Sequence, residues 1–126
     1  MSSIINASVS SNGIVSTADA SGRILLQSNG TNTNAMAWVA FNSNTQTILS
    51  SYNVASITYL STTRYQINFT NAMTNGNYAV ALAASDTPTI GTYLVVDNSQ
   101  LPTTTALTLY SNASGRFYYS AVVFGQ

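Results

Sequence analysis

The feature that most constrains this chain is the alternation of apolar and polar residues in short windows. The clearest window carries Tyr65, Ile67 and Phe69, each followed by a polar residue. A period of two puts successive side chains on opposite faces of a strand, whereas a helix needs a period near 3.6. This window therefore predicts a strand with one buried face.

Similar windows recur along the chain and favour an all-β fold. β-branched and aromatic residues dominate further windows at 36–41, 45–50, 54–60, 78–83, 91–96 and 107–110. The last window, 116–124, is mostly apolar on both faces, so we expect that strand to be covered on both sides. Asn-Gly pairs that begin at Asn12, Asn29 and Asn75 predict hairpin turns.

Composition divides the chain near residue 34. No aromatic residue precedes Trp38, and residues 1–34 hold only short apolar islands between polar runs. Such a segment buries little surface of its own, which predicts an extended N-terminal arm over 1–34 and a β domain over 35–126. About eight strands in that domain suggest an antiparallel β-sandwich or a jelly-roll-like fold.

The scarcity of charge excludes most catalytic chemistry. Charged residues make up 5% of the 126 residues, and the chain has no Lys, Glu, His or Cys. An average soluble domain has about 25%. Without imidazole, thiol or side-chain amine groups, no Cys/His zinc site can form, and the only bases left for a Ser or Thr nucleophile are the three Asp carboxylates, for which no Ser or Thr stands out as a partner. We therefore expect a protein that is not an enzyme, with no catalytic residue, no metal ligand and no cofactor.

The same scarcity bears on partners. Three Arg without Lys do not make the basic surface that nucleic acids require, and no apolar run approaches the roughly 20 residues of a membrane helix. A net charge of zero favours self-association. The composition thus indicates a protein that functions in an assembly; a solitary β domain with a neutral surface is the alternative.

Two groups of residues each allow two roles. A set of tyrosines could form a sugar-binding platform or fill interface positions; it comprises Tyr52, Tyr59, Tyr93, Tyr110, Tyr118 and Tyr119. The three Arg either pair with the three Asp or are solvated at strand ends.

Two stretches resemble a β module of structural and tail-fibre proteins of tailed phages, especially those of cyanobacteria and marine bacteria. The first is GIVSTADASGRILLQSNG at 13–30. The second runs in order through AWVAF at 37–41, SYNVASI at 51–57, YQINFTNAM at 65–73 and NYAV at 77–80. Ala40 stands where the module usually has Asn.

The resemblance implies a non-enzymatic virion protein that forms a homotrimer. The short length and the lack of a shaft favour a capsid decoration or cement protein, which binds other virion proteins such as the major capsid protein. A small tail-fibre or tail-tip protein that binds the host receptor is one alternative, and a lectin-like module for a host surface glycan is another. We expect Ile4, Ile5, Ile14 and Val15 to anchor the arm to the particle.

Overall fold

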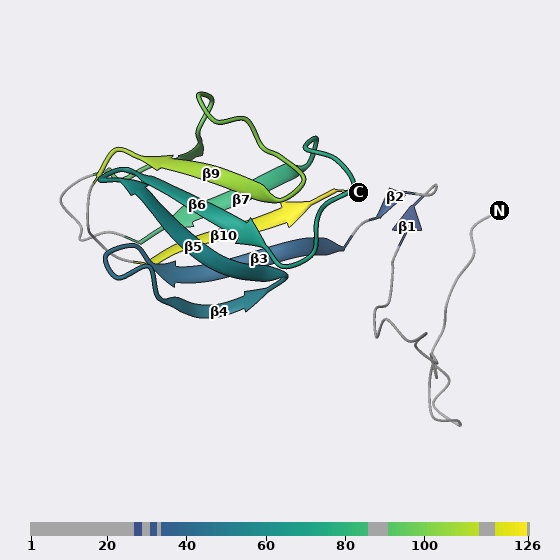
Figure 1. Cartoon of the computed structure of the whole chain (residues 1–126), viewed down its shortest axis with the longest axis horizontal. Helices are drawn as coiled ribbons and strands as arrows, with labels where there is room; N and C mark the ends of the chain where they lie inside the picture. Colours follow the sequence, from purple (N-terminus) through teal and green to yellow (C-terminus); the bar gives the residue numbers. More distant parts are fainter. Residues whose placement is uncertain (1–26, 29–30, 33, 86–90, 114–117, 126) are drawn as a thin grey trace, which may run out of the picture.

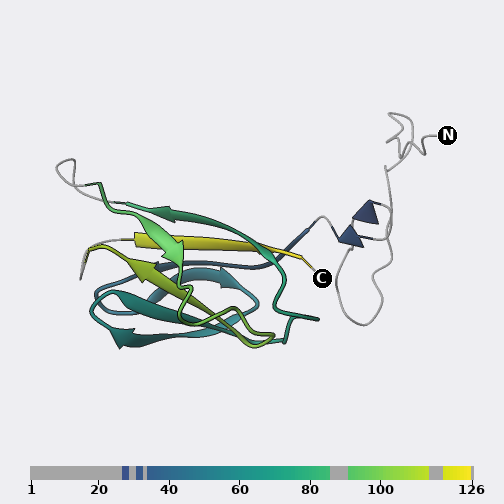
Figure 2. The ribbon, with the colours of Figure 1, turned by 90° about the horizontal axis from the view of Figure 1, so that it is seen from above.

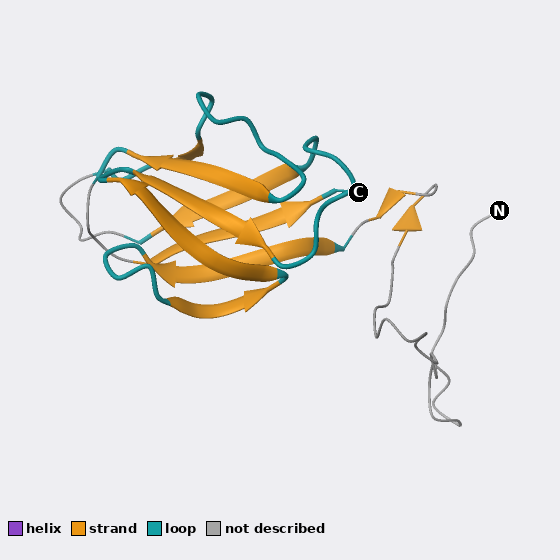
Figure 3. Ribbon diagram, in the orientation of Figure 1, coloured by secondary structure: helices purple, strands orange, loops and turns teal. Residues whose placement is uncertain are grey.

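The chain folds as a β-sandwich. A computed structural model describes residues 27–28, 31–32, 34–85, 91–113 and 118–125. Within these residues it contains strands but no helices, and two four-stranded antiparallel sheets pack face to face (Figures 1 and 3). The all-β sandwich predicted from the alternating windows is confirmed. No helix in the described part of the chain could span a membrane.

Each sheet has its own set of strands. The first, here called the β3 sheet, has the order β4 (Ile48–Tyr52), β3 (Ala35–Asn42), β10 (Tyr118–Phe124), β7 (Ala79–Ala84). The second, here called the β6 sheet, has the order β5 (Val54–Ser61), β6 (Arg64–Phe69), β9 (Ala106–Ser111), β8 (Leu94–Val96). The chain passes from the β3 sheet to the β6 sheet and back twice, so each layer combines strands that are distant in sequence.

The core lies between the two sheets and is built from alternate strand residues. β3 contributes Ala37, Val39 and Phe41, which are at most 2% exposed. Tyr65 and Tyr119 reach in from the opposite sheets, and the rings of Phe41, Tyr65 and Tyr119 lie 5.6–5.9 Å apart. Rings at these distances and inclined angles add to the stability that apolar burial provides.

Two predicted strands begin later than expected. The window 91–96 predicts a strand, whereas β8 spans only Leu94–Val96. The window 45–50 predicts a strand, whereas β4 spans Ile48–Tyr52. The Asn42 Oδ1 atom accepts hydrogen bonds from the backbone amides of Asn44 and Thr45, at 2.9 and 3.3 Å. The Asn42 side chain thus takes the place of strand partners for these two amides and stabilises a turn between β3 and β4.

The Asn-Gly pair at Asn75 does not form a hairpin. It lies in the connection from β6 to β7, which belong to different sheets. A Cβ atom on Gly76 would come within 2.5 Å of the Pro102 carbonyl oxygen. Gly76 is therefore placed for a close approach of two backbone segments and not for a two-residue turn.

A separate two-stranded ribbon precedes the sandwich. β1 (Gln27–Ser28) and β2 (Thr31–Asn32) pair antiparallel on either side of residues 29–30, which agrees with the hairpin predicted there. Figures 1 and 2 both place this ribbon beyond the end of the sandwich at which β3 begins. The proposed anchors Ile4, Ile5, Ile14 and Val15 lie outside the described residues, and so does the Asn12 turn. The arm over 1–34 stays a prediction.

Candidate binding surfaces

The outer face of the β3 sheet is continuous and carries no charged side chain. We call it the apolar face. Pairing across the sheet aligns Tyr52, Trp38, Val122 and Ala81 in one row, and Ser50, Ala40, Ser120 and Ala83 in the next. The face is completed by Asn42, Ala79, Tyr118 and Phe124. It consists of apolar side chains with a few neutral polar ones.

The large side chains of the apolar face remain open to solvent. Trp38 is 37% exposed, Tyr52 41%, Tyr118 56% and Phe124 40%. The strand predicted to be covered on both sides, observed as β10, is thus covered on only one side by the residues that the structure describes. Its inner residues Tyr119 and Val123 are at most 1% exposed. Clusters of exposed large apolar groups on a soluble protein indicate an interaction surface.

The outer face of the β6 sheet carries polar side chains along β5, β6 and β9, some of which bond to one another. The Asn68 side-chain amide donates to the hydroxyls of Ser56 and Thr58, at 3.0 and 2.8 Å. Gln66 and Thr108 lie opposite each other on the same face. This face carries more hydrogen-bonding side chains than the apolar face, with Val95 on β8 as a large apolar side chain that is 42% exposed.

A charged cluster lies at one end of the polar face. The Arg64 Nε atom donates to Asp97 Oδ2 at 2.6 Å, and the guanidinium lies 5.9 Å from the centre of the Tyr110 ring. These residues border a shallow groove of about 330 Å³, together with Val95 and Asn98. Of the two uses considered for the arginines, pairing with an aspartate is confirmed for Arg64.

Asp97 is held in its ionised form by several donors. The Ser99 hydroxyl and backbone amide donate to its Oδ1 atom at 2.7 and 2.9 Å. These two bonds, and after them the Arg64 guanidinium, keep the pKa of the Asp97 carboxyl below its usual value. The pair joins β6 to the turn after β8, so its first role is to fix this end of the sheet.

The tyrosines predicted as a possible sugar platform are divided among four locations. Tyr59 lies on β5 at the edge of the core, with its ring centre 5.9 Å from that of Tyr65. Tyr119 is fully buried in the core, so it cannot contact a ligand. Tyr52 and Tyr118 lie on the apolar face. Of the predicted set, Tyr93 and Tyr110 have rings close to each other, with centres 6.4 Å apart and planes inclined by 43°, beside Arg64.

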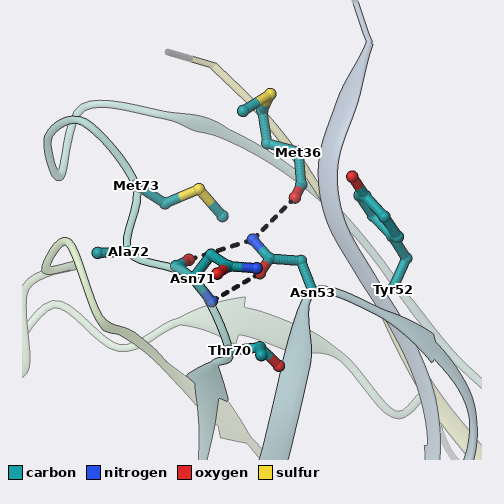
Figure 4. A pocket seen from close by; sticks show the side chains of 7 residues that line it. All are labelled: Met36, Tyr52, Asn53, Thr70, Asn71, Ala72 and Met73. Atoms are coloured by element: carbon teal, nitrogen blue, oxygen red, sulfur yellow. Dashed lines mark hydrogen bonds between the residues drawn. The ribbon is translucent and has the colours of Figure 1, made fainter. Parts of the chain in front are cut away.

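A further hollow occurs at the corner where the chain leaves the β3 sheet for the β6 sheet. Asn53 is the single residue between β4 and β5, and it has a positive φ of 56°. Its Nδ2 atom donates to the carbonyls of Met36 and Asn71, and its Oδ1 atom accepts from the Asn71 amide (Figure 4). Because these bonds occupy both ends of the amide, Asn53 serves the corner and leaves little for a ligand.

The described residues contain no group of three or more His, Cys, Asp or Glu side chains able to hold a metal ion.

The sequence did not identify the apolar face as a site. Its signal was present in the Ala-rich window 78–84, where Val80 and Leu82 face the core and Ala79, Ala81 and Ala83 face outward.

Comparisons with known proteins give no relative. No family model, no curated protein and no solved structure matches the chain.

Proposed function

We propose that this chain is a non-enzymatic structural protein of a tailed-phage particle, a homotrimer that decorates the capsid surface. The proposal combines the resemblance of residues 13–80 to phage structural modules with the surface of the sandwich. It places the protein on the virion and makes other virion proteins its partners.

The apolar face is the observation that carries the proposal. A sheet face that exposes Trp38, Tyr118 and Phe124 without any charge suits contact with protein better than contact with water. A surface of Ser, Thr and Asn also loses less side-chain entropy in a contact than one of Lys and Glu. Both features favour a protein that works through assembly.

The anchoring role falls to the N-terminal arm. Its apolar islands, which include Ile4, Ile5, Ile14 and Val15, would join exposed strand edges of a virion protein. In this proposal the sandwich forms the exposed knob and the arm holds it to the particle.

Quantitative mass spectrometry of density-purified phage particles tests the proposal. We expect the chain in the particle fraction, at hundreds of copies for a capsid decoration protein and at most a few dozen for a tail-fibre or tail-tip protein; absence from particles would refute the virion role. Adding back purified chain lacking residues 1–34 tests the arm. We expect this variant to fold, to remain a trimer and to fail to bind the particle.

A host-surface glycan is a second candidate ligand, because Tyr93, Tyr110 and Arg64 form an exposed cluster. Aromatic faces beside a guanidinium and amide groups can stack on a sugar ring and bond its hydroxyls. A glycan array with the purified chain tests this, with Tyr110→Ala as the variant and Tyr59→Ala as the matched control. Binding that Tyr110→Ala abolishes and Tyr59→Ala retains would support a lectin role.

A further inference from the structure

We infer that the apolar face is the surface through which copies of this chain associate, with the large side chains of one copy packed against the alanines of the next. The inference rests on the homotrimer of the proposed function and specifies its interface. It names an occupant for a face that a single chain leaves open.

β10 carries apolar side chains on both of its faces. Its inner residues Tyr119, Ala121 and Val123 fill the core, and its outer residues include Tyr118, Val122 and Phe124. Strands that are apolar on both faces are typical of sheets covered on both sides. The sandwich supplies one cover, so β10 requires a second one from outside the described chain.

The apolar face is complementary to itself in side-chain size. Along the row through Trp38, side-chain size falls from Tyr52 and Trp38 on β4 and β3 to Ala81 on β7. The β7 edge presents only alanines on this side, Ala79, Ala81 and Ala83. A copy that lays its Trp38 half over the Ala half of its neighbour therefore places bulky groups where there is room for them.

This contact joins two different halves of the face, so it is heterologous, and it closes a ring of three when each copy is rotated by a third of a full turn from its neighbour. Each subunit then offers its large half to one neighbour and its small half to the other. The charged pair Arg64–Asp97 lies on the opposite sheet, so no described charge needs to be buried in the ring.

The apolar face has the size of a functional surface patch. Four strands about 4.8 Å apart and about six residues long give the face a projected area of roughly 400 Å². This area is comparable with the largest apolar patch of a typical soluble monomer, which often has a function. A glycan would need more hydrogen-bonding groups than the face provides, since Asn42, Ser50 and Ser120 are its main polar side chains.

The chain contains a built-in probe of this interface. Trp38 is the only tryptophan, it lies on the apolar face, and a single subunit leaves it 37% exposed. Its fluorescence in the full-length protein therefore reports whether a neighbour covers the face. Sedimentation equilibrium gives the mass of the same sample.

The test compares two Ala→Asp variants. Ala81 lies on the apolar face, and Ala55 is an exposed alanine on β5 of the other sheet. We expect the natural protein to have three times the mass of the 13.3 kDa chain and a Trp38 that acrylamide quenches weakly. A carboxylate buried without a partner opposes association, so Ala81→Asp should raise the dissociation constant at least about tenfold. Quenching of Trp38 should rise with dissociation, and Ala55→Asp should change neither reading.

Three results would overturn the inference. A trimer that Ala81→Asp leaves intact, with Trp38 open to acrylamide, would place the interface elsewhere and leave the proposed function standing. A monomer with an open Trp38 would refute self-association altogether. A monomer with a shielded Trp38 would mean that another segment of the chain covers the face.

Folding is checked by circular dichroism, and Ala83→Asp, in the neighbouring row, replaces Ala81→Asp if that variant does not fold. The mass and quenching of the natural protein test the inference without any substitution. Absence of the chain from phage particles would refute the virion role alone.

Discussion

At the scale of single residues, Asn53 determines how the chain turns from the β3 sheet into the β6 sheet. It combines a left-handed backbone with three hydrogen bonds to Met36 and Asn71. Asn53→Ala loses the bonds and keeps an unfavourable φ, so we expect a loss of about 2–4 kcal/mol in the free energy of unfolding. Asn53→Gly loses the same bonds but suits the φ, and should cost about half as much. Urea denaturation measures both; equal losses would contradict the backbone argument.

Gly76 illustrates a second constraint at this scale. A Cβ atom there would meet the Pro102 carbonyl oxygen at 2.5 Å, whereas a Cβ atom on Gly91 would meet nothing within 4 Å. Gly76→Ala should therefore lower the free energy of unfolding by about 1–3 kcal/mol through steric strain. Gly91→Ala is the matched control and should change it by less than about 0.5 kcal/mol. Thermal melts that rank the two variants the other way would refute this account.

At the scale of strands, the alternating pattern determined how much of the fold the sequence could predict. The inner residues of β6 and β10 follow from a period of two, which is a local property. The pairing of β3 with β10 joins residues such as Phe41 and Tyr119, which are far apart in sequence, and no local pattern specifies it. The hydrogen bond between Arg64 and Asp97 joins residues that are 33 positions apart in sequence. The composition indicates that arginines could pair with aspartates, but it does not specify which two residues form a pair.

β10 also offers a matched pair of substitutions within one strand. Val123 is 1% exposed in the core, and its neighbour Val122 lies half-buried on the apolar face. Val123→Ala creates a cavity and should lower the free energy of unfolding by about 2 kcal/mol at any protein concentration. Val122→Ala should mainly weaken the association of subunits. The melting temperature of this variant should therefore differ most from that of the natural protein at high protein concentration, where the natural protein is assembled. Differential scanning fluorimetry over a dilution series separates the two; identical concentration dependence for both would contradict the distinct roles of the two faces.

At the scale of the whole molecule, the small number of ionisable groups simplifies the response to pH. The chain has no His, Cys, Lys or Glu, so between about pH 5 and pH 9 no side chain has an ordinary pKa. Two described groups have shifted pKa values, one below this pH range and one above it. Hydrogen bonds from Ser99, and after them the Arg64 guanidinium, lower the pKa of Asp97, and burial raises the pKa of Tyr78 to about 12.

These shifts predict a stability profile with a flat middle and two falling edges. The folded state binds the Asp97 proton more weakly than the unfolded chain does, so that stabilisation is present above about pH 4 and is lost as the pH falls through the lowered pKa. The folded state holds the Tyr78 proton more tightly, so that stabilisation is present below about pH 10 and is lost as the pH rises toward 12. Urea midpoints followed by Trp38 fluorescence from pH 2 to pH 12 measure the profile. Asp97→Asn should flatten the profile at acid pH alone, and Tyr78→Phe should flatten it at alkaline pH alone. A urea midpoint that changes steeply between about pH 5 and pH 9 would show that a group other than Asp97 and Tyr78 controls stability.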